Sequence, residues 1–239
     1  MSSAPPFLPP VVSAPLIVLH ADEHLAVVVK PRELLSCPGT STPDWDSVSR
    51  RIPTLFPAAY GPLLAHRLDA PTSGLMVVAL TPDTHRALSA QFAKRTVAKA
   101  YQALLAGVLA ATLGAEGLID LPMRGEWRLR PRQVVDLERG RPAQTRWRVL
   151  AHDPGSPGHT RIHLEPLTGR THQLRLHAAD PRGLGLPIVG DRIYGNDGAH
   201  GPTPAPGAPL PALCLHATEL AFTHPVTGER LAFVSAPDF

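Results

Sequence analysis

The amino-acid sequence predicts an α+β fold built on a mixed, largely antiparallel β-sheet. Short apolar runs of strand length recur along the chain, and several of them come in pairs joined by polar turns. Only single segments with helical spacing separate the others. The regular strand–helix alternation of a doubly wound fold is absent, as are the glycine-rich and Walker loops of nucleotide-binding proteins.

The first part of the chain predicts an arm, two strands and a helix. Residues 1–14 are rich in proline and serine, which is typical of a flexible arm. The apolar runs 16–19 and 25–29 predict two strands, joined by the polar turn at 22–24. Apolar residues at helical spacing within 45–56 predict a short helix.

Two further strands and a second helix are expected next. The apolar runs 63–68 and 75–80 predict strands on either side of an irregular loop. Thr81 is a favourable N-cap and Pro82 suits the first helical position. A helix is therefore expected to begin here and to end near the basic pair at 94–95.

The rest of the chain predicts mainly strands. Residues 123–141 are rich in arginine and poor in core residues, which predicts a loop region, whereas 170–178 has the rhythm of a helix. The proline-rich run 199–211 predicts a long surface loop. Apolar runs predict strands at 100–108, 144–150 and 161–164, and a closing β-hairpin at 213–222 and 230–234.

The composition indicates an ordinary globular protein. The 239 residues are 44% hydrophobic, which is enough to form a substantial core. Cys37 and Cys214 lie far apart in sequence and form neither a disulfide framework nor a metal-binding cysteine motif. No run approaches the roughly 20 apolar residues that cross a bilayer. We therefore expect a cytoplasmic protein without membrane contact, and a monomer by default.

The basic residues are almost all arginine. Arginine supplies 20 of the 23 positive side chains, and the pI is about 9.2. Its guanidinium group makes bidentate hydrogen bonds to phosphate and stacks on bases, which favours a nucleic-acid partner. The codon usage of a GC-rich genome would explain the same preference, so composition alone does not decide between the two.

Asp69 is the first candidate for chemistry. It follows an apolar run and opens a loop of Thr, Ser and Gly residues that ends at Gly74. A carboxylate at the end of a strand is well placed to face a cleft. The alternative is an aspartate that caps a turn, which is the more common role for this residue in isolation.

The run 167–175 is the second candidate. It gathers Arg170, His172, Gln173 and Arg175 around a glycine turn at the predicted start of a helix. Free N–H groups at a helix start, together with basic side chains, favour binding of an anion. The alternative is a basic surface in contact with water alone.

Further motifs lie along the chain at 66–69, 72–74, 99–101, 169–177, 190–195 and 215–217, and at the C-terminal 223–225 and 236–239. Their order resembles that of the RluA family of pseudouridine synthases. The resemblance extends from about residue 16 to the end of the chain, which predicts one catalytic domain over 15–239. It leaves no room for an S4-type RNA-binding domain at the N-terminus. The segments 120–122, 130–133 and 143–145 are most similar to the member that gives the family its name, whereas 199–211 is longer than expected.

The resemblance implies the pseudouridine synthase fold, with a central active-site cleft, and an isomerisation that uses no cofactor and no metal. The N1–C1′ bond of a uridine breaks, the base turns, and a C5–C1′ bond forms. Asp69 would be the reacting carboxylate and Arg170 the cation that favours its charged form. Tyr101 would place its aromatic ring against the uracil, and its phenol would help to remove the C5 proton. These three are the predicted catalytic residues.

The resemblance further implies RNA as the partner, bound as a stem-loop from which the target base is flipped. Arg67 would fill the place that the flipped base leaves in the stack, or hold the phosphate of the flipped nucleotide. His66 would have a structural role. The arginine-rich segment 124–148 would supply further RNA contacts. The expected targets are the first uridine of the tRNA anticodon loop and a uridine in a hairpin of large-subunit ribosomal RNA. The predicted substrate-binding residues are His66, Arg67, Leu68, Thr72, Gly169, Thr171, His172, Gln173 and Arg175.

The sequence fits other functions less well. A metal hydrolase is disfavoured because His172 and His177 are five residues apart and have no acidic partner at zincin spacing. A glycosidase needs a second carboxylate, and no motif ties Asp83 or Asp120 to the site. A non-catalytic RNA-binding module, and a synthase of the same family with a different target uridine, stay as alternatives.

Overall fold

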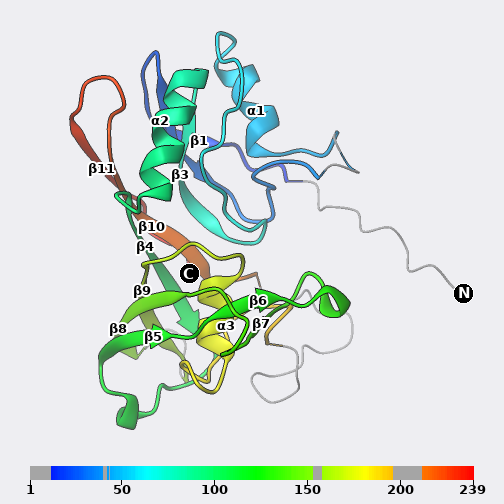
Figure 1. Cartoon of the computed structure of the whole chain (residues 1–239), viewed down its shortest axis with the longest axis vertical. Coiled ribbons are helices and arrows are strands. Elements are labelled where there is room, and N and C mark those ends of the chain that lie inside the picture. Colours follow the sequence, from blue (N-terminus) through cyan, green and yellow to red (C-terminus); the bar gives the residue numbers. More distant parts are fainter. Residues whose placement is uncertain (1–11, 40–41, 43, 153–157, 196–211) are drawn as a thin grey trace, which may run out of the picture.

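The computed structural model describes residues 12–39, 42, 44–152, 158–195 and 212–239, and a continuous mixed sheet runs through them. In Figure 1 the first strands and helices and the C-terminal strand occupy the upper half of the molecule, the middle strands and the last helix occupy the lower half, and two long strands run between them. Along the sheet the order is β1 (Ile17–Ala21), β2 (Leu25–Lys30), β3 (Ser73–Ala79), β10 (Leu215–Thr223), β4 (Ala98–Leu105), β9 (Thr160–Pro166), β8 (Gln144–His152) and β5 (Glu116–Asp120), with β11 (Arg230–Val234) beside β10.

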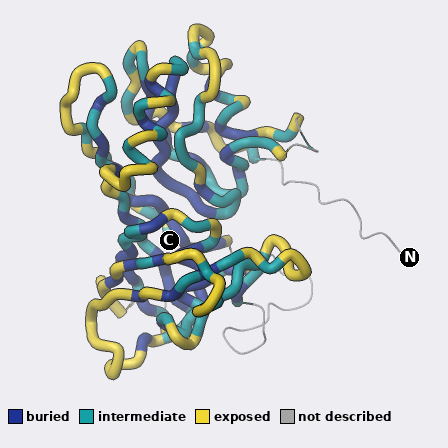
Figure 2. The backbone as a smooth tube through the Cα atoms, viewed as in Figure 1, coloured by how far each residue is buried: buried dark blue, intermediate teal, exposed yellow. Residues whose placement is uncertain are grey.

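The first half is a sheet covered on both faces. Successive side chains of a strand point to opposite faces, and in β2 and β3 both sets are buried. Val28 and Met76 pack on the side of helix α1 (Val48–Leu55), whereas Val27 and Val77 pack on the side of helix α2 (Pro82–Ala93). Figure 2 shows this as buried backbone at the centre and exposed backbone in the outer loops.

Both predicted helices in this half are confirmed, and each begins at a side-chain cap. The Ser47 hydroxyl accepts a hydrogen bond from the Arg50 N–H at the start of α1. The Thr81 hydroxyl accepts one from Thr84 N–H, and Pro82 occupies the first position of α2 as expected.

The predicted strand at 63–68 is wrong. This segment makes one isolated bridge, between Leu64 and Val78, and otherwise runs as irregular backbone. Its apolar side chains pack into the core, and the Leu63 carbonyl accepts the Ala79 N–H of β3, but the backbone bonds farther along go to side chains. The Leu68 N–H and carbonyl both bond to the Ser36 hydroxyl.

The second half is an antiparallel sheet packed on the short helix α3 (Gln173–Ala179). Strand β5 was not predicted, because Ile119 is its one buried residue and its apolar pattern is weak. The arginine-rich loop region predicted over 123–141 in fact contains a small hairpin, β6 (Met123–Gly125) and β7 (Gln133–Val135). Helix α3 begins at Gln173, three residues after the predicted start, because His172 has left-handed backbone (φ 56°).

The two halves join where β3 meets β10. This is the one parallel strand pair among the described residues, and it places Ser73 and Gly74 beside His216 and Ala217. Gly74 has φ +112°, and a Cβ there would lie 2.4 Å from the Ala217 carbonyl oxygen. A glycine is therefore required at the point where the loop after Asp69 enters the sheet.

The predicted α+β class with a largely antiparallel sheet is confirmed. The proline-rich run 199–211 and most of the predicted arm at 1–14 lie outside the described residues. Within the described ranges, no helix has the length and apolar content to span a membrane.

Candidate active site

A cleft of about 630 Å³ brings the predicted site residues together. Its walls come from the loop at 64–72, the end of α2, strand β4, and the turn that leads into α3. All twelve predicted catalytic and substrate-binding residues line it: His66, Arg67, Leu68, Asp69, Thr72, Tyr101, Gly169, Arg170, Thr171, His172, Gln173 and Arg175.

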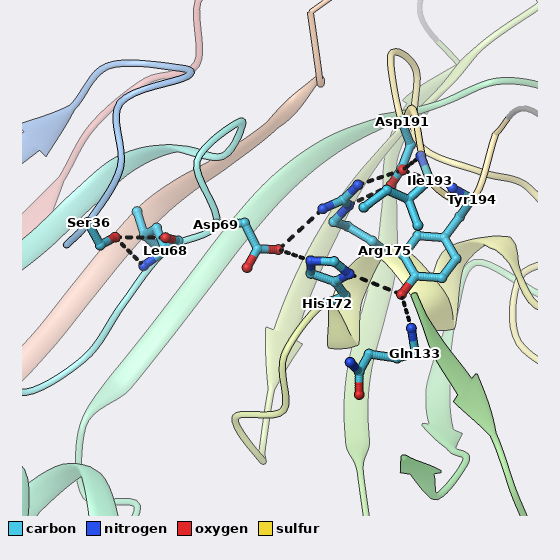
Figure 3. A network of polar contacts seen from close by, with 9 residues as sticks. All are labelled: Ser36, Leu68, Asp69, Gln133, His172, Arg175, Asp191, Ile193 and Tyr194. Atoms are coloured by element: carbon cyan, nitrogen blue, oxygen red, sulfur yellow. Dashed lines mark hydrogen bonds and ion pairs between the residues drawn. The ribbon is translucent and has the colours of Figure 1, made fainter. Parts of the chain in front are cut away.

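Asp69 is held from both sides by buried side chains. On one side the Ser36 hydroxyl bonds both backbone groups of Leu68, at 2.7 and 3.0 Å (Figure 3). On the other side the Lys30 ammonium donates to the carbonyl oxygen of Ala70 at 2.9 Å and to the carbonyls of Pro31 and Leu34. Burial lowers the pKa of Lys30 to about 7, although the negative charge of Asp69 acts in the opposite direction. These anchors fix the backbone that carries the carboxylate.

The cation beside Asp69 is Arg175, not Arg170. The Arg175 Nη1 lies 3.5 Å from Asp69 Oδ2, and Figure 3 shows the two side chains facing each other. The Arg170 Nε instead donates to the carbonyl of Pro142. His172 has left-handed backbone, so the chain turns between Arg170 and the first helical residue, and the two arginines contact different partners. The predicted ion pair between Arg170 and Asp69 is therefore absent here.

Arg175 is itself fixed by a buried carboxylate. Its Nε and Nη2 donate to the two oxygens of Asp191, both at 2.7 Å. Asp191 Oδ1 also accepts the N–H groups of Ile193 and Tyr194. Burial acts to raise the pKa of Asp191, but the bonds from Arg175 and from the backbone outweigh it and lower the pKa. A planar, bidentate pair of this kind orients the guanidinium group toward Asp69.

His172 lies next to the same carboxylate, with its Nε2 3.8 Å from Asp69 Oδ2. Its Nδ1 lies 3.1 Å from the Tyr194 hydroxyl, which accepts the Gln133 N–H at 2.9 Å (Figure 3). Burial lowers the pKa of His172, so the ring is neutral near pH 7. The Tyr194 hydroxyl can donate its own proton to His172 Nδ1. The proton of the neutral imidazole then lies on Nε2, which faces Asp69.

Tyr101 stands in the cleft on β4, between Ala217 of β10 and Leu164 of β9. Its ring packs against both main core clusters. Burial, and then the negative charge of Asp69, raise the pKa of its phenol. The group is therefore a neutral phenol with an aromatic face, next to the carboxylate.

Several predicted substrate-binding residues are buried or make their contacts within the protein. Leu68 and Thr72 are buried, and Gln173 makes bonds to Thr168, Thr145 and the backbone of residues 144 and 170. The His66 ring stacks on Phe92 with centroids 4.4 Å apart, and its Nε2 accepts the Val77 N–H. These four side chains shape the cleft wall. The more accessible positions are Arg67, Gly169 and Thr171, which are exposed at the cleft.

Comparison with known proteins identifies the family of this chain. The profile of the RNA pseudouridylate synthase family matches residues 24–180. The chain belongs to the RNA pseudouridine synthases. It is 42% identical over 224 residues to the dual-specificity RNA pseudouridine synthase RluA of Pasteurella multocida, with 94% of each chain covered. It is 43% identical to the protein of the same name from Yersinia pestis, over 94% of this chain and 100% of the relative.

Solved structures agree with this family. The human RNA pseudouridylate synthase domain containing 1 matches this synthase with a TM-score of 0.74 and 27% identity, over 96% of this chain and 86% of the other. The human RNA pseudouridylate synthase domain containing 4 matches with a TM-score of 0.69 and 26% identity. The predicted family, fold and reaction, an isomerisation of uridine in RNA, are confirmed.

The sequence did not identify the residues that support this synthase's cleft. Lys30 and Ser36 precede the aspartate by more than thirty residues and belong to no motif with an assigned role. Asp191 and Tyr194 lie within the recognised run 190–195, but that run had no function attached to it. A buried lysine at a strand end and a charged residue in an apolar context are signals that could have marked Lys30 and Asp191.

Removing the Tyr194 hydroxyl is expected to slow the reaction of this synthase without blocking RNA binding. In Tyr194→Phe the Gln133 N–H and His172 Nδ1 lose their shared partner, while the ring contacts stay. We expect kcat to fall about tenfold, the value of one hydrogen bond of about 1.4 kcal/mol, at little change in KM. The pH profile of kcat should also shift, which a merely structural role would not cause. Tyr60→Phe, at an exposed tyrosine, is the control and should match the wild type.

The stability of this synthase is expected to fall below pH 6.5 partly through His66. Burial, and then the charge of Lys99, lower the pKa of His66 to about 3, against 6.5 in the unfolded chain. Its stabilising contribution is complete above pH 6.5 and is lost as the pH falls toward 3. In urea unfolding, the free energy of unfolding of His66→Gln should fall less steeply than that of the wild type between pH 6.5 and 4. The difference in slope should be up to about 1.4 kcal/mol per pH unit. The exposed His152→Gln should retain the slope of the wild type; equal slopes in all three proteins would contradict the assignment.

Proposed function

We propose that Asp69 is the reacting carboxylate of this RNA pseudouridine synthase and that its target is a uridine flipped out of an RNA stem-loop. The observation that supports this role is the position of the carboxylate. It is the cleft carboxylate that faces both a fixed guanidinium group, 3.5 Å away, and a neutral imidazole. An anion held in this way can act on the sugar or base while the N1–C1′ bond breaks.

We further assign separate roles to the groups around it. Arg175 opposes the charge of Asp69, and Tyr101 offers its ring to the uracil. Since the pKa of Tyr101 is raised, its phenol favours stacking and hydrogen-bond donation over removal of the C5 proton. Arg170 is held by one bond to a backbone carbonyl, so it can turn toward Asp69 when RNA enters, and it stays a proposed catalytic residue.

The RNA surface is assigned to arginines at the mouth of the cleft and on the β6–β7 hairpin. Arg67 is exposed beside Asp69 and is placed to fill the stack that the flipped base leaves. Trp127 at the hairpin tip is 70% exposed, with Arg128 over its ring, a pairing that suits stacking on unpaired bases.

We propose two RNA substrates, since the relatives in Pasteurella multocida and Yersinia pestis are named dual-specificity synthases. The targets are the first uridine of the tRNA anticodon loop and a hairpin of large-subunit ribosomal RNA with a similar loop. Their shared recognition would rest on loop shape and phosphate position rather than on a long base sequence.

The test is tritium release from transcripts labelled at C5 of uridine, because C5 loses its hydrogen when it joins C1′. The purified protein should release tritium from both the anticodon stem-loop and the ribosomal hairpin, and not from versions with cytidine at the target position. Release from one RNA only would reduce the proposal to a single specificity. Release from neither would contradict both proposed targets.

A further inference from the structure

A second cavity, of about 430 Å³, adjoins the catalytic cleft. Five residues line both: Phe92, Arg95, Lys99, Pro166 and Leu167. The volume is within the range of small-ligand pockets, so it is large enough for part of a nucleotide. The chemistry described so far uses none of these five residues.

Lys99 stands at this junction without an anionic partner. It lies on β4, two residues before Tyr101, and its Nζ is 3.9 Å from the point where a side chain on Gly169 would begin. Among the described residues its ammonium group makes no hydrogen bond and no ion pair. Burial, and then the charge of Arg95, lower the pKa of Lys99. A partly buried cation that faces another cation is costly unless an anion joins them.

Arg95 supplies the second charge. It follows the C-terminal end of α2 with left-handed backbone (φ 58°), and its N–H bonds to the Phe92 carbonyl. This turn directs an exposed arginine to the junction, where its side chain also has no partner within the described part of the chain. The two carboxylates nearby, Glu165 and Glu219, line the second cavity but not the catalytic cleft.

We propose that Lys99 and Arg95 form a phosphate subsite that binds a phosphodiester next to the target uridine. The inference rests on the proposed function of the cleft and adds a contact that positions the RNA strand. Both carboxylates line the second cavity and neither lines the catalytic cleft, so they disfavour a phosphate inside the second cavity and the phosphate lies at the junction. The strand then continues from the uridine pocket past Lys99 into the second cavity, where Val97, Leu220 and Phe233 offer apolar surface to the neighbouring nucleotide.

The first experiment compares two lysines that are close in sequence. Lys99→Gln removes the junction charge, and Lys94→Gln removes an exposed charge that lines neither cavity. Binding of a fluorescein-labelled stem-loop, the one that the wild-type protein converts, is measured by anisotropy over a range of salt concentrations. Lys99→Gln should weaken binding about tenfold and reduce the slope of log Kd against log salt by about 0.7 to 0.9, as expected for one lost phosphate contact. Lys94→Gln should remain within about twofold of the wild type.

The second experiment neutralises the phosphate instead of the lysine. Stem-loops with a methylphosphonate at single linkages around the target uridine should bind the wild-type protein about tenfold more weakly at one linkage. A methylphosphonate at that linkage should not weaken the binding of Lys99→Gln any further. This RNA series decides the question even if Lys99→Gln fails to fold, as judged by circular dichroism.

Two results would overturn the subsite. One is a methylphosphonate series that affects no linkage next to the uridine, or that affects Lys99→Gln as strongly as the wild type. The other is an unchanged Kd in Lys99→Gln together with an altered pH profile of kcat, which would make Lys99 an acid–base group. In both cases the wild-type protein still releases tritium, so failure of the subsite is distinguishable from failure of the proposed function.

Discussion

Asp69→Asn is expected to lower the rate of pseudouridine formation by about 10⁴-fold or more, the scale on which loss of a reacting side chain acts. Asparagine keeps the shape of the side chain and removes its charge and its nucleophilic oxygen. The backbone at this position is held by Ser36 and Lys30, neither of which contacts the carboxylate oxygens through a hydrogen bond. Arg175 keeps its bidentate pair with Asp191. The variant should therefore fold and bind RNA.

The measurement is single-turnover tritium release beside anisotropy with the same stem-loop. Asp83→Asn, at an exposed carboxylate in the first turn of α2, is the matched control and should retain wild-type rates. Loss of RNA binding along with activity in Asp69→Asn would indicate a role in binding instead. A rate within tenfold of the wild type would end the assignment of Asp69 as the reacting group.

The elements that could be predicted are those whose local signals agree with their packing. Strand β2 has apolar side chains that fill both faces of a covered sheet, and α2 combines an N-cap, a proline and an apolar face. Segment 63–68 has the same apolar character, but it makes only an isolated bridge to β3 at Leu64, and its last residue, Leu68, bonds to the Ser36 hydroxyl, more than thirty residues earlier in the chain. No local pattern encodes that contact.

The contacts between side chains in the site were also beyond prediction from local sequence patterns. The motif order pointed to Asp69 and the basic run at 169–177, but it predicted Arg170 beside the carboxylate, where the structure has Arg175. The choice between the two arginines depends on the left-handed residue His172, where the chain turns before α3 begins, and on Asp191, which captures Arg175. Both are consequences of tertiary packing. Sequence alone therefore locates the residues of the cleft more reliably than their contacts.

Asp191→Ala is expected to cost about 3 to 5 kcal/mol in the free energy of unfolding, because it leaves a buried guanidinium group without its counter-ion. The side chain of Arg175 is 3% exposed and that of Asp191 is fully buried. The remaining contact of Arg175, to Asp69 at 3.5 Å, is too long to replace two bonds of 2.7 Å. The N–H groups of Ile193 and Tyr194 also lose their acceptor, which loosens the segment that holds His172.

Urea unfolding at pH 7 measures this effect, and Asp46→Ala is the control. Asp46 pairs with Arg51 through a similar fork, but Asp46 is half exposed and Arg51 also bonds to the carbonyls of Val12 and Ala14. Its removal should cost about 1 kcal/mol or less. In the double variant Asp191→Ala/Arg175→Ala the loss should be smaller than the sum of the two single losses, since no charge is left buried alone. Additive losses would show that the pair does not act as a unit, and Arg175 would then need another explanation for its orientation toward Asp69.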